Sequence, residues 1–262
     1  MSEINLYQIC RSAQSHSEAD AGFTLLDATA DGADGTGYLS IRRFLLGSQL
    51  DQESYYGFFP ADFHRITGLN ATAVRSLIEQ QGAAADVISV SPFFDQMALY
   101  LNVVEQAIGA CAGGRDAIRQ CAALVAPEFR PDRDVTTSLD TIFRNCFVAK
   151  PSFWAEWLRH GDLIFARTRD SAAVLQALAI EQVASLLLCS QPQWVVGACS
   201  PLRLPFSPAP VASLVGVPDL IVLDSLKIAY ARSGTEEYLK TFQQLRNKIV
   251  ERHAASRAQR HG

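Results

Sequence analysis

The chain has 262 residues, of which 48% are hydrophobic and 19% charged, which is enough apolar material for a large α/β domain or two small ones with a buried core. The formal net charge of −4 shows no basic excess, which excludes an electrostatically driven nucleic-acid footprint. Six cysteines without C-x-x-C spacing favour buried free thiols.

The first half of the chain alternates expected strands and helices. A period-two pattern predicts a strand at residues 4–10, and an apolar stripe predicts a helix at residues 38–47. The aromatic run at residues 55–60 predicts an inner strand that ends in a ligand-lining loop. Asn70 is a good cap for a helix at residues 71–81. Together these elements predict an α/β fold.

Residues 86–106 combine a strand end with a helix start. A short β-branched strand at 86–90 is followed by Asp95, which opens a helix expected to reach about residue 110. Asn102 and Glu105 share a face turned away from the apolar stripe of that helix. Such a junction is where α/β proteins place ligand-facing chemistry, and a solvated polar face is the alternative interpretation.

The second half contains the most apolar helix and a proline-rich segment. A carboxylate at Glu181 is costly within the apolar helix expected at 171–190, so it needs a partner, a function or a route to solvent. The most apolar run, 183–189, is far shorter than the ~20 residues that a membrane span needs. Prolines between 201 and 218 predict an extended loop, and two helices follow it. We therefore expect one α/β domain with a mostly parallel sheet over 1–218, and a C-terminal helical extension packed on it over 219–262.

Polar residues gather at the expected strand ends. They are Asp27, Tyr56, Gly57, Asp62, Ser91, Asp95, Asn145 and Lys150. Such a set suits a nucleotide-sugar, whose phosphates and hydroxyls need several donors and acceptors, and a hydrolase is the alternative. His64 is a further candidate for ligand contact, with a surface or structural role as its alternative. The common glycine-rich phosphate loops and the G-x-S-x-G and H-E-x-x-H motifs are absent from the sequence.

Five segments carry a family resemblance. They are GFTLLDATAD, IRRFLLGSQLDQESYYGFFPADFHRITGL, ADVISVSPFFDQMALYLNVVEQ, NCFVAKPSFWAEWL and LDSLKIAYARSGTEEYL. Together they resemble a family of bacterial capsule and lipopolysaccharide biosynthesis proteins that are glycosyltransferase-like, with a GT-A type nucleotide-sugar-binding fold. The segments occur in the family's order and spread over nearly the whole chain.

The resemblance implies a glycosyltransferase that moves a sugar from a nucleotide-sugar donor to a growing surface glycan. It implies that strands 55–59 and 86–90 lie side by side, with 145–150 closing the acceptor side. A carboxylate would act as general base on the acceptor hydroxyl if the configuration inverts. The candidates for this base are, in order, Asp95, Glu105 and Glu181.

The binding residues follow from the same reasoning. Expected donor contacts are Asp27, Tyr56, Gly57, Asp86 and Ser91, and expected acceptor contacts are Asn145, Lys150, Trp154 and His64. GT-A enzymes usually hold a divalent cation, Mn²⁺ or Mg²⁺, on the diphosphate through a D-x-D motif. This chain has no such motif at the expected strand end, and Asp132-Arg133-Asp134 lies in a proline-flanked loop. The sequence therefore names no metal ligands.

Partners and location are also expectations at this stage. The last helix could pair with a second copy of the chain or with other polysaccharide-assembly proteins. We expect the protein in the cytoplasm, either free or at the inner face of the membrane through its partners. The alternative to an enzyme is a catalytically inactive GT-A-like module that binds a glycan or a partner in the same pocket. The sequence specifies neither the donor sugar nor the acceptor nor the anomeric outcome.

Overall fold

The computed structural model describes residues 3–17, 19–31, 36–81, 84–111, 113–208 and 215–261. Its strands are β1 (Ile4–Cys10), β2 (Thr24–Asp27), β3 (Tyr55–Pro60), β4 (Val87–Ser89), β5 (Phe147–Ala149) and β6 (Val196–Ala198). Its helices are α1 (Ala13–Ser17), α2 (Tyr38–Gly47), α3 (Phe63–Thr67), α4 (Ala71–Gln81), α5 (Phe94–Leu99), α6 (Val103–Ala110), α7 (Arg115–Val125), α8 (Pro151–Arg167), α9 (Ala173–Ser190), α10 (Val217–Ser233) and α11 (Glu236–His261), with a 3-10 turn at Pro201–Arg203. Residues 209–214 of the expected proline-rich loop lie outside the described residues.

The strands form one six-stranded sheet in the order β2-β1-β3-β5-β4-β6. β1 pairs in parallel with β2 and β3, and β4 pairs in parallel with β6, whereas β5 is antiparallel to both β3 and β4. The predicted α/β class is confirmed, but the sheet is mixed rather than mostly parallel. The expected pairing of β3 with β4 is wrong, because β5 lies between them. The local pattern of a strand does not specify its neighbours, which depend on contacts distant in the sequence.

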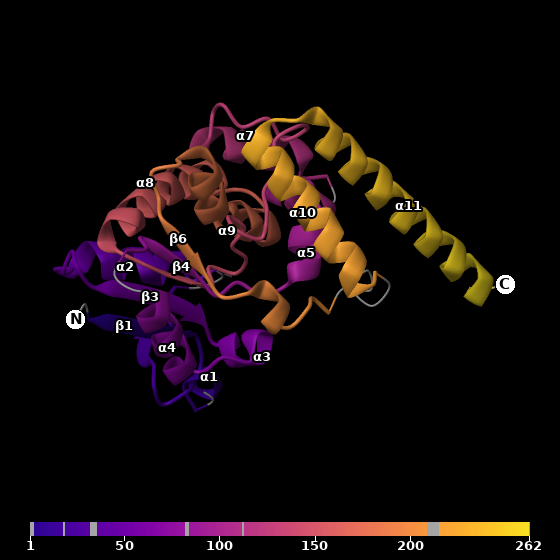
Figure 1. Cartoon of the computed structure of the whole chain (residues 1–262). Coiled ribbons are helices and arrows are strands. Elements are labelled where there is room, and N and C mark those ends of the chain that lie inside the picture. The colour runs from indigo at the N-terminus through magenta and orange to yellow at the C-terminus, as the bar shows by residue number, and fades with distance from the viewer. Residues whose placement is uncertain are drawn as a thin grey trace.

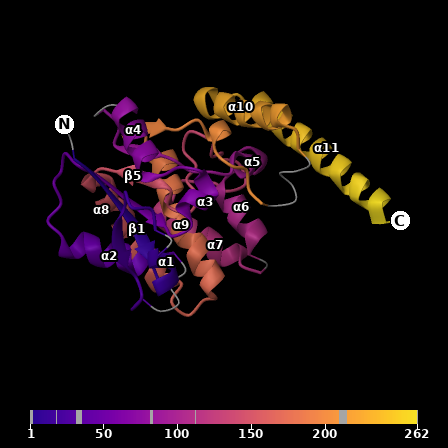
Figure 2. The ribbon, with the colours of Figure 1, turned by 90° about the horizontal axis from the view of Figure 1, so that it is seen from below.

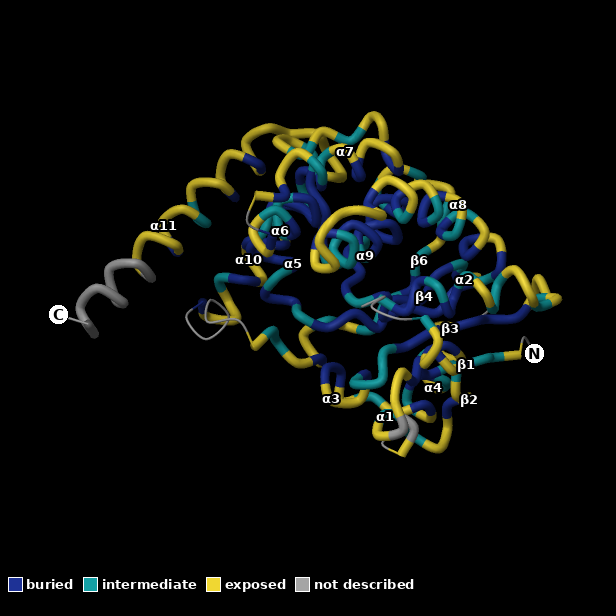
Figure 3. The backbone as a smooth tube through the Cα atoms, turned by 180° about the vertical axis from the view of Figure 1, so that it is seen from behind, coloured by how far each residue is buried: buried dark blue, intermediate teal, exposed yellow. Residues whose placement is uncertain are grey.

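Helices cover both faces of this sheet (Figure 1). Tyr56 and Phe58 of β3 pack with α2, α6, α7, α8 and α9 on one face, and Tyr55 and Phe59 pack with α3 and α4 on the other. Successive side chains of a strand point to opposite faces, so a sheet covered on both faces buries every residue of an inner strand. The almost continuously apolar sequence of β3 has this cause. Figure 3 shows the resulting buried layer in the strands and along α9.

The single helix expected from Asp95 to about residue 110 is two helices. α5 ends at Leu99, and α6 begins after Asn102, whose side chain accepts a hydrogen bond from the backbone N–H of Glu105. Asn102 also donates to the carbonyl oxygens of Pro131 and Asp134, at 2.9 and 2.6 Å. The pair Asn102 and Glu105, three residues apart, is therefore an N-terminal capping signature and not a polar helix face.

The last two helices pack together and onto α5, around Leu220, Leu223, Leu239 and Phe242. The expected boundary at residue 219 falls in the first turn of α10. Figure 2 shows α11 extending past the body of the molecule toward the C-terminus. Within the described residues one helix, α9, is long and apolar enough to cross a membrane, with a mean hydropathy of 1.6. Core helices of soluble proteins meet the same criterion, and here α9 packs in the main core with α6, α7 and α8.

Candidate functional site

A cavity of about 220 Å³, lined by both polar and apolar side chains, opens at the carboxyl ends of β1 and β3. Ile9, Arg11 and Ser12 line it from the end of β1, and Pro60, Ala61 and Asp62 from the end of β3. Within the sheet, β2 lies next to β1 on one side and β3 lies next to β1 on the other. The strand order therefore reverses at β1. Ligands of α/β proteins bind at such switch points, outside the carboxyl ends of the strands. The cavity is therefore the leading candidate for a binding site.

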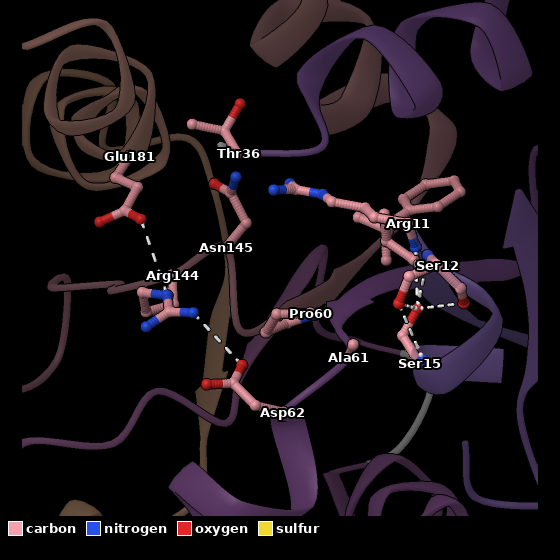
Figure 4. A pocket seen from close by; sticks show the side chains of 12 residues that line it. Arg11, Ser12, Ser15, Thr36, Pro60, Ala61, Asp62, Arg144, Asn145 and Glu181 are labelled. Atoms are coloured by element: carbon pink, nitrogen blue, oxygen red, sulfur yellow. Dashed lines mark hydrogen bonds and ion pairs between the residues drawn. The ribbon is translucent and has the colours of Figure 1, made fainter. Parts of the chain in front are cut away.

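Arg144 connects two carboxylates across this cavity (Figure 4). Its Nη2 atom lies 3.2 Å from Asp62 Oδ1, and its Nε atom lies 3.8 Å from Glu181 Oε1. Asp62 follows β3, Arg144 precedes β5, and Glu181 lies in the middle of α9. Asp62 has a second partner, Arg65, on the outer side. The network joins three separate elements and partly neutralises both carboxylates.

Glu181 is set to change protonation near neutral pH. Burial raises the pKa of its carboxyl group to about 7, and the nearby Arg144 guanidinium opposes that rise. Desolvation dominates because Ile180 and Val183, its neighbours on α9, are fully buried and the apolar surroundings penalise the charged form. A carboxylate with a pKa near 7 can accept and return a proton at physiological pH.

The turn that carries Arg144 and Asn145 has an uncommon backbone. Both residues are left-handed, with φ of 57° and 52°, a conformation that costs on the order of 1 kcal/mol or more in residues other than glycine. The Ser91 hydroxyl accepts a hydrogen bond from Phe143 N at 2.7 Å and so helps to hold the turn. Asn145 is 3% exposed, and its Oδ1 atom has no hydrogen-bond partner among the described residues. A buried acceptor without a partner at a cavity wall is suited to a ligand hydroxyl or amide.

The turn after β1 supplies a further cation. The Ser15 hydroxyl accepts hydrogen bonds from the backbone N–H groups of Arg11 and Ser12, at 2.9 and 3.0 Å, which fixes the path of the chain. Figure 4 shows the Arg11 side chain extending toward Asn145. Among the described residues, no carboxylate pairs with its guanidinium. Arg144 therefore pairs with two carboxylates of the cavity, whereas Arg11 pairs with none in the described part of the chain.

Two of the three predicted base candidates lie away from the cavity and have internal partners. Asp95 is buried and accepts hydrogen bonds from Ser207 N, at 2.8 Å, and from the Ser207 hydroxyl. Glu105 forms an ion pair with Arg246 of α11 at 2.8 Å and accepts from Leu101 N. Their carboxylates connect α5 and α6 to the rest of the chain. Glu181 is the predicted base candidate that lines the cavity.

Asp86 and Lys150 lie at the other end of the sheet, where β1 and β3 begin. Asp86 precedes β4 and Lys150 follows the antiparallel β5, so both residues face away from the carboxyl ends of β1 and β3. Their side chains form an ion pair at 3.3 Å, and Asp86 also accepts from Val195 N. The structure therefore does not bring these two residues to the cavity where Asn145, another predicted contact, is found.

Three more predicted contacts belong to the core. Trp154 is fully buried and donates from its indole nitrogen to the carbonyl oxygen of Tyr56 at 2.9 Å, and the Tyr56 hydroxyl accepts from Asp51 N. A side chain at Gly57 would come within 2.9 Å of Val148 on the neighbouring strand, so this position serves close strand packing.

Asp27, His64 and Ser91 lie near the end of the sheet at which the cavity opens, but they do not line the cavity. Asp27 ends β2 and accepts from Thr29 N at 2.9 Å. His64 is exposed on α3, with its ring nitrogen 3.2 Å from the Leu69 carbonyl. Ser91 is buried under the turn described above. The candidate residues that the structure does bring together are Asn145 and Glu181, with Asp62 from the wider set of strand-end residues.

Among the described residues that line the cavity, the polar residues Arg11, Ser12, Ser15, Thr36 and Arg144 were not predicted. Arg11 and Ser12 follow the first expected strand directly, so the strand-end argument applied to Asp62 could have found them, whereas Ser15 lies in the helix α1 beyond them. Arg144 had no comparable signal, because it precedes an antiparallel strand whose place in the sheet depends on distant contacts. Arginine needs the same attention as carboxylates at strand ends when the ligand is anionic.

The described residues that line the cavity do not fit a bound divalent cation. Magnesium and manganese prefer several converging oxygen ligands, whereas the positive Arg144 guanidinium lies between the two lining carboxylates. In the described part of the chain, no group of three or more histidine, cysteine, aspartate and glutamate side chains is arranged to hold a metal ion. No family model, curated protein or solved structure matches this chain.

Proposed function

We propose that the protein is a glycosyltransferase that transfers a sugar from a nucleotide-sugar donor to a hydroxyl of a bacterial surface glycan. The observation that carries this proposal is the position of Glu181, with a pKa near 7, beside Arg144 in a cavity at the strand-order switch point. A GT-A-like fold is part of the proposal. It is supported by the resemblance of the sequence segments and by the switch-point cavity.

In the proposed reaction, Glu181 is the general base. Its carboxylate takes the proton of the acceptor hydroxyl while the hydroxyl oxygen forms a bond to the anomeric carbon of the donor. The bond between that carbon and the diphosphate oxygen breaks, and its electron pair leaves with the nucleoside diphosphate. This is a displacement with inversion, and it assigns to Glu181 the role that the sequence left open among three carboxylates.

The rest of the cavity suits the other parts of such a donor. Arg11 and Arg144 provide positive charge for phosphate oxygens. The unpartnered Oδ1 atom of Asn145 can accept a hydrogen bond from a sugar hydroxyl. Asp95 and Glu105 support the elements around the site through their internal hydrogen bonds and take no part in the proposed chemistry.

Donor turnover tests the proposal. The purified protein is incubated with a panel of nucleotide-sugars, without an added acceptor, and release of nucleoside diphosphate is followed as slow donor hydrolysis. We expect hydrolysis of at least one donor, and a loss of about 10²- to 10⁴-fold in Glu181→Gln, as for removal of a general base. Glu79→Gln, at an exposed position on α4, is the matched control.

The possible outcomes separate the two functions. No binding and no turnover of any donor contradicts the glycosyltransferase proposal. Donor binding with no turnover favours the inactive binding module. Turnover that is unchanged in Glu181→Gln contradicts the assignment of the base and leaves the reaction class intact.

A further inference from the structure

Two arginines line the cavity, Arg11 from the end of β1 and Arg144 from the turn before β5. Arg144 is shared between Asp62 and Glu181, while Arg65 already pairs with Asp62 from outside the cavity. Arg11 lines the cavity and has no carboxylate partner among the described residues. The two carboxylates of the cavity are thus accompanied by three guanidinium groups, and burial, which raises the pKa of Glu181, further reduces the negative charge that faces them. The site therefore favours an anionic ligand.

We propose that Arg11 and Arg144 bind the diphosphate of the donor directly and replace the divalent cation that such transferases usually require. This inference rests on the proposed glycosyl transfer, whose donor carries the diphosphate. A guanidinium group presents a planar set of N–H donors that matches two phosphate oxygens at once. Two such groups on separate elements can hold both phosphates without a metal ion.

The geometry allows Arg144 to change partners. Its contact with Glu181, at 3.8 Å, is longer than a good charge-assisted hydrogen bond. Binding of a phosphate to the guanidinium would draw it from the carboxylates and free Glu181 for an acceptor hydroxyl. As the bond from the anomeric carbon to the phosphate oxygen breaks, charge develops on the leaving diphosphate, and fixed cations at that position stabilise the transition state.

A second, independent feature points to a sugar or ribose next to the diphosphate. Asn145 is nine-tenths buried or more, yet its Oδ1 atom has no hydrogen-bond partner among the described residues. Its left-handed backbone, next to that of Arg144, holds the amide at the cavity wall. Figure 4 shows Asn145 between Arg11 and Arg144. The cavity thus offers a hydrogen-bond acceptor for a hydroxyl next to the two guanidinium groups, which suits a ligand whose sugar hydroxyls lie beside a diphosphate.

Calorimetry with inorganic pyrophosphate and with uridine and guanosine diphosphates tests this inference. Each probe is titrated into the full chain in a chelator and again in excess Mn²⁺. We expect at least one probe to bind in the chelator with an affinity within about threefold of that in Mn²⁺. Arg11→Gln and Arg144→Gln should each weaken binding about ten- to hundredfold, which is the effect of losing charge-assisted hydrogen bonds.

Arg65→Gln is the matched control, because Arg65 pairs with Asp62 but does not line the cavity. The Arg65→Gln variant should bind the probe with the same affinity as the unmodified chain. Thermal unfolding of each variant establishes that it is folded, and Arg11→Gln changes the cavity without removing a partner of Asp62 or Glu181. Either arginine variant can therefore decide the question if the other does not fold.

Three results overturn the inference. The first is binding that occurs only with Mn²⁺, and the second is binding that both arginine variants leave unchanged. The third is the absence of binding by every probe in both conditions. Donor turnover measured in parallel distinguishes this failure from that of the function. Turnover that depends on Mn²⁺ would support the transferase proposal and contradict diphosphate binding by the two arginines. Diphosphate binding that depends on the arginines, without turnover of any donor, would support the arginine site and contradict the transferase proposal.

Discussion

Arg144 Nε lies 3.8 Å from Glu181 Oε1, and this contact joins the turn before β5 to the middle of α9. Burial raises the pKa of the Glu181 carboxyl group to about 7, and the guanidinium opposes the rise. The same arginine lies 3.2 Å from Asp62. One cation thus affects the protonation of the proposed base and the electrostatics of the whole cavity.

The rate of donor turnover should depend on this pair. Glu181 must be deprotonated to act as base, so we expect kcat/KM to rise with pH, with an inflection near pH 7, and to level off at higher pH. Arg144→Gln removes the charge that lowers the pKa, so its profile should shift to higher pH. Glu79→Gln should keep the original profile. A profile without an inflection near neutral pH would contradict the role of Glu181.

The same carboxyl group should affect stability. Its pKa is raised from 4.5 to about 7 on folding, so between these values the folded state binds more protons than the unfolded state. Stability from this group is complete below about pH 4.5 and is lost as the pH rises to about 7. In Glu181→Gln, the unfolding free energy should change less with pH between about 4.5 and 7, by up to about 3 kcal/mol. Urea unfolding at several pH values measures the difference, and parallel curves for the two proteins would contradict it.

Replacement of Asp95 should affect folding and not the site. Asp95→Ala removes the acceptor of two hydrogen bonds from Ser207, and we expect a loss of about 1–3 kcal/mol in unfolding free energy. Diphosphate affinity of the folded fraction should be unchanged. Asp170→Ala, at an exposed position between α8 and α9, is the control for stability. A selective loss of turnover in a stable Asp95→Ala protein would restore Asp95 as the base candidate.

Lys227 should contribute strongly to the free energy of unfolding by fixing α10 to the neighbouring backbone. Its ammonium group is fully buried and donates to the carbonyl oxygens of Met97, Tyr100 and Thr136. Lys227→Met fills a similar volume but leaves these carbonyls without their donor, so we expect a loss of about 2–5 kcal/mol. Urea unfolding measures it. Lys240→Met, on the exposed side of α11, should change stability by about 0.5 kcal/mol or less, and equal effects of the two substitutions would disprove the assignment.

Substitutions at Asn145 can distinguish the contribution of the backbone conformation of the turn from that of the side-chain amide. Asn145→Gly keeps access to the left-handed conformation, so stability should change by less than about 1 kcal/mol. Asn145→Ala adds backbone strain and should be less stable than Asn145→Gly. Both variants lose the amide, and we expect both to raise the KM of the donor or the acceptor. An unchanged KM in Asn145→Gly would show that the amide does not contact the ligand.

Local sequence patterns determined most of the elements. The strand at residues 4–10 and the helices at 38–47 and 71–81 were predicted with the boundaries found in the structure. Their signals are periodic burial and helix caps, which act over a few residues. The same local signals misled at residues 95–110, where the capping pair Asn102 and Glu105 was interpreted as a polar helix face.

The arrangement of these elements was decided only in three dimensions. β5 lies between β3 and β4 and runs against them, and its short apolar sequence carries no information about that position. The antiparallel direction of β5 brings Arg144 and Asn145 to the end of the sheet where Asp62 lies, and it places Lys150 at the other end, beside Asp86.

The candidate site follows the same division. The sequence by itself identified Glu181 as a carboxylate that needed a reason, because charge is expensive in an apolar helix. It could not show that the reason is Arg144, which lies 37 positions earlier in the chain and meets Glu181 only after the sheet and α9 have packed. Burial, partners and pKa are properties of the packed environment, so the sequence determined which groups were available and the tertiary structure decided which of them meet.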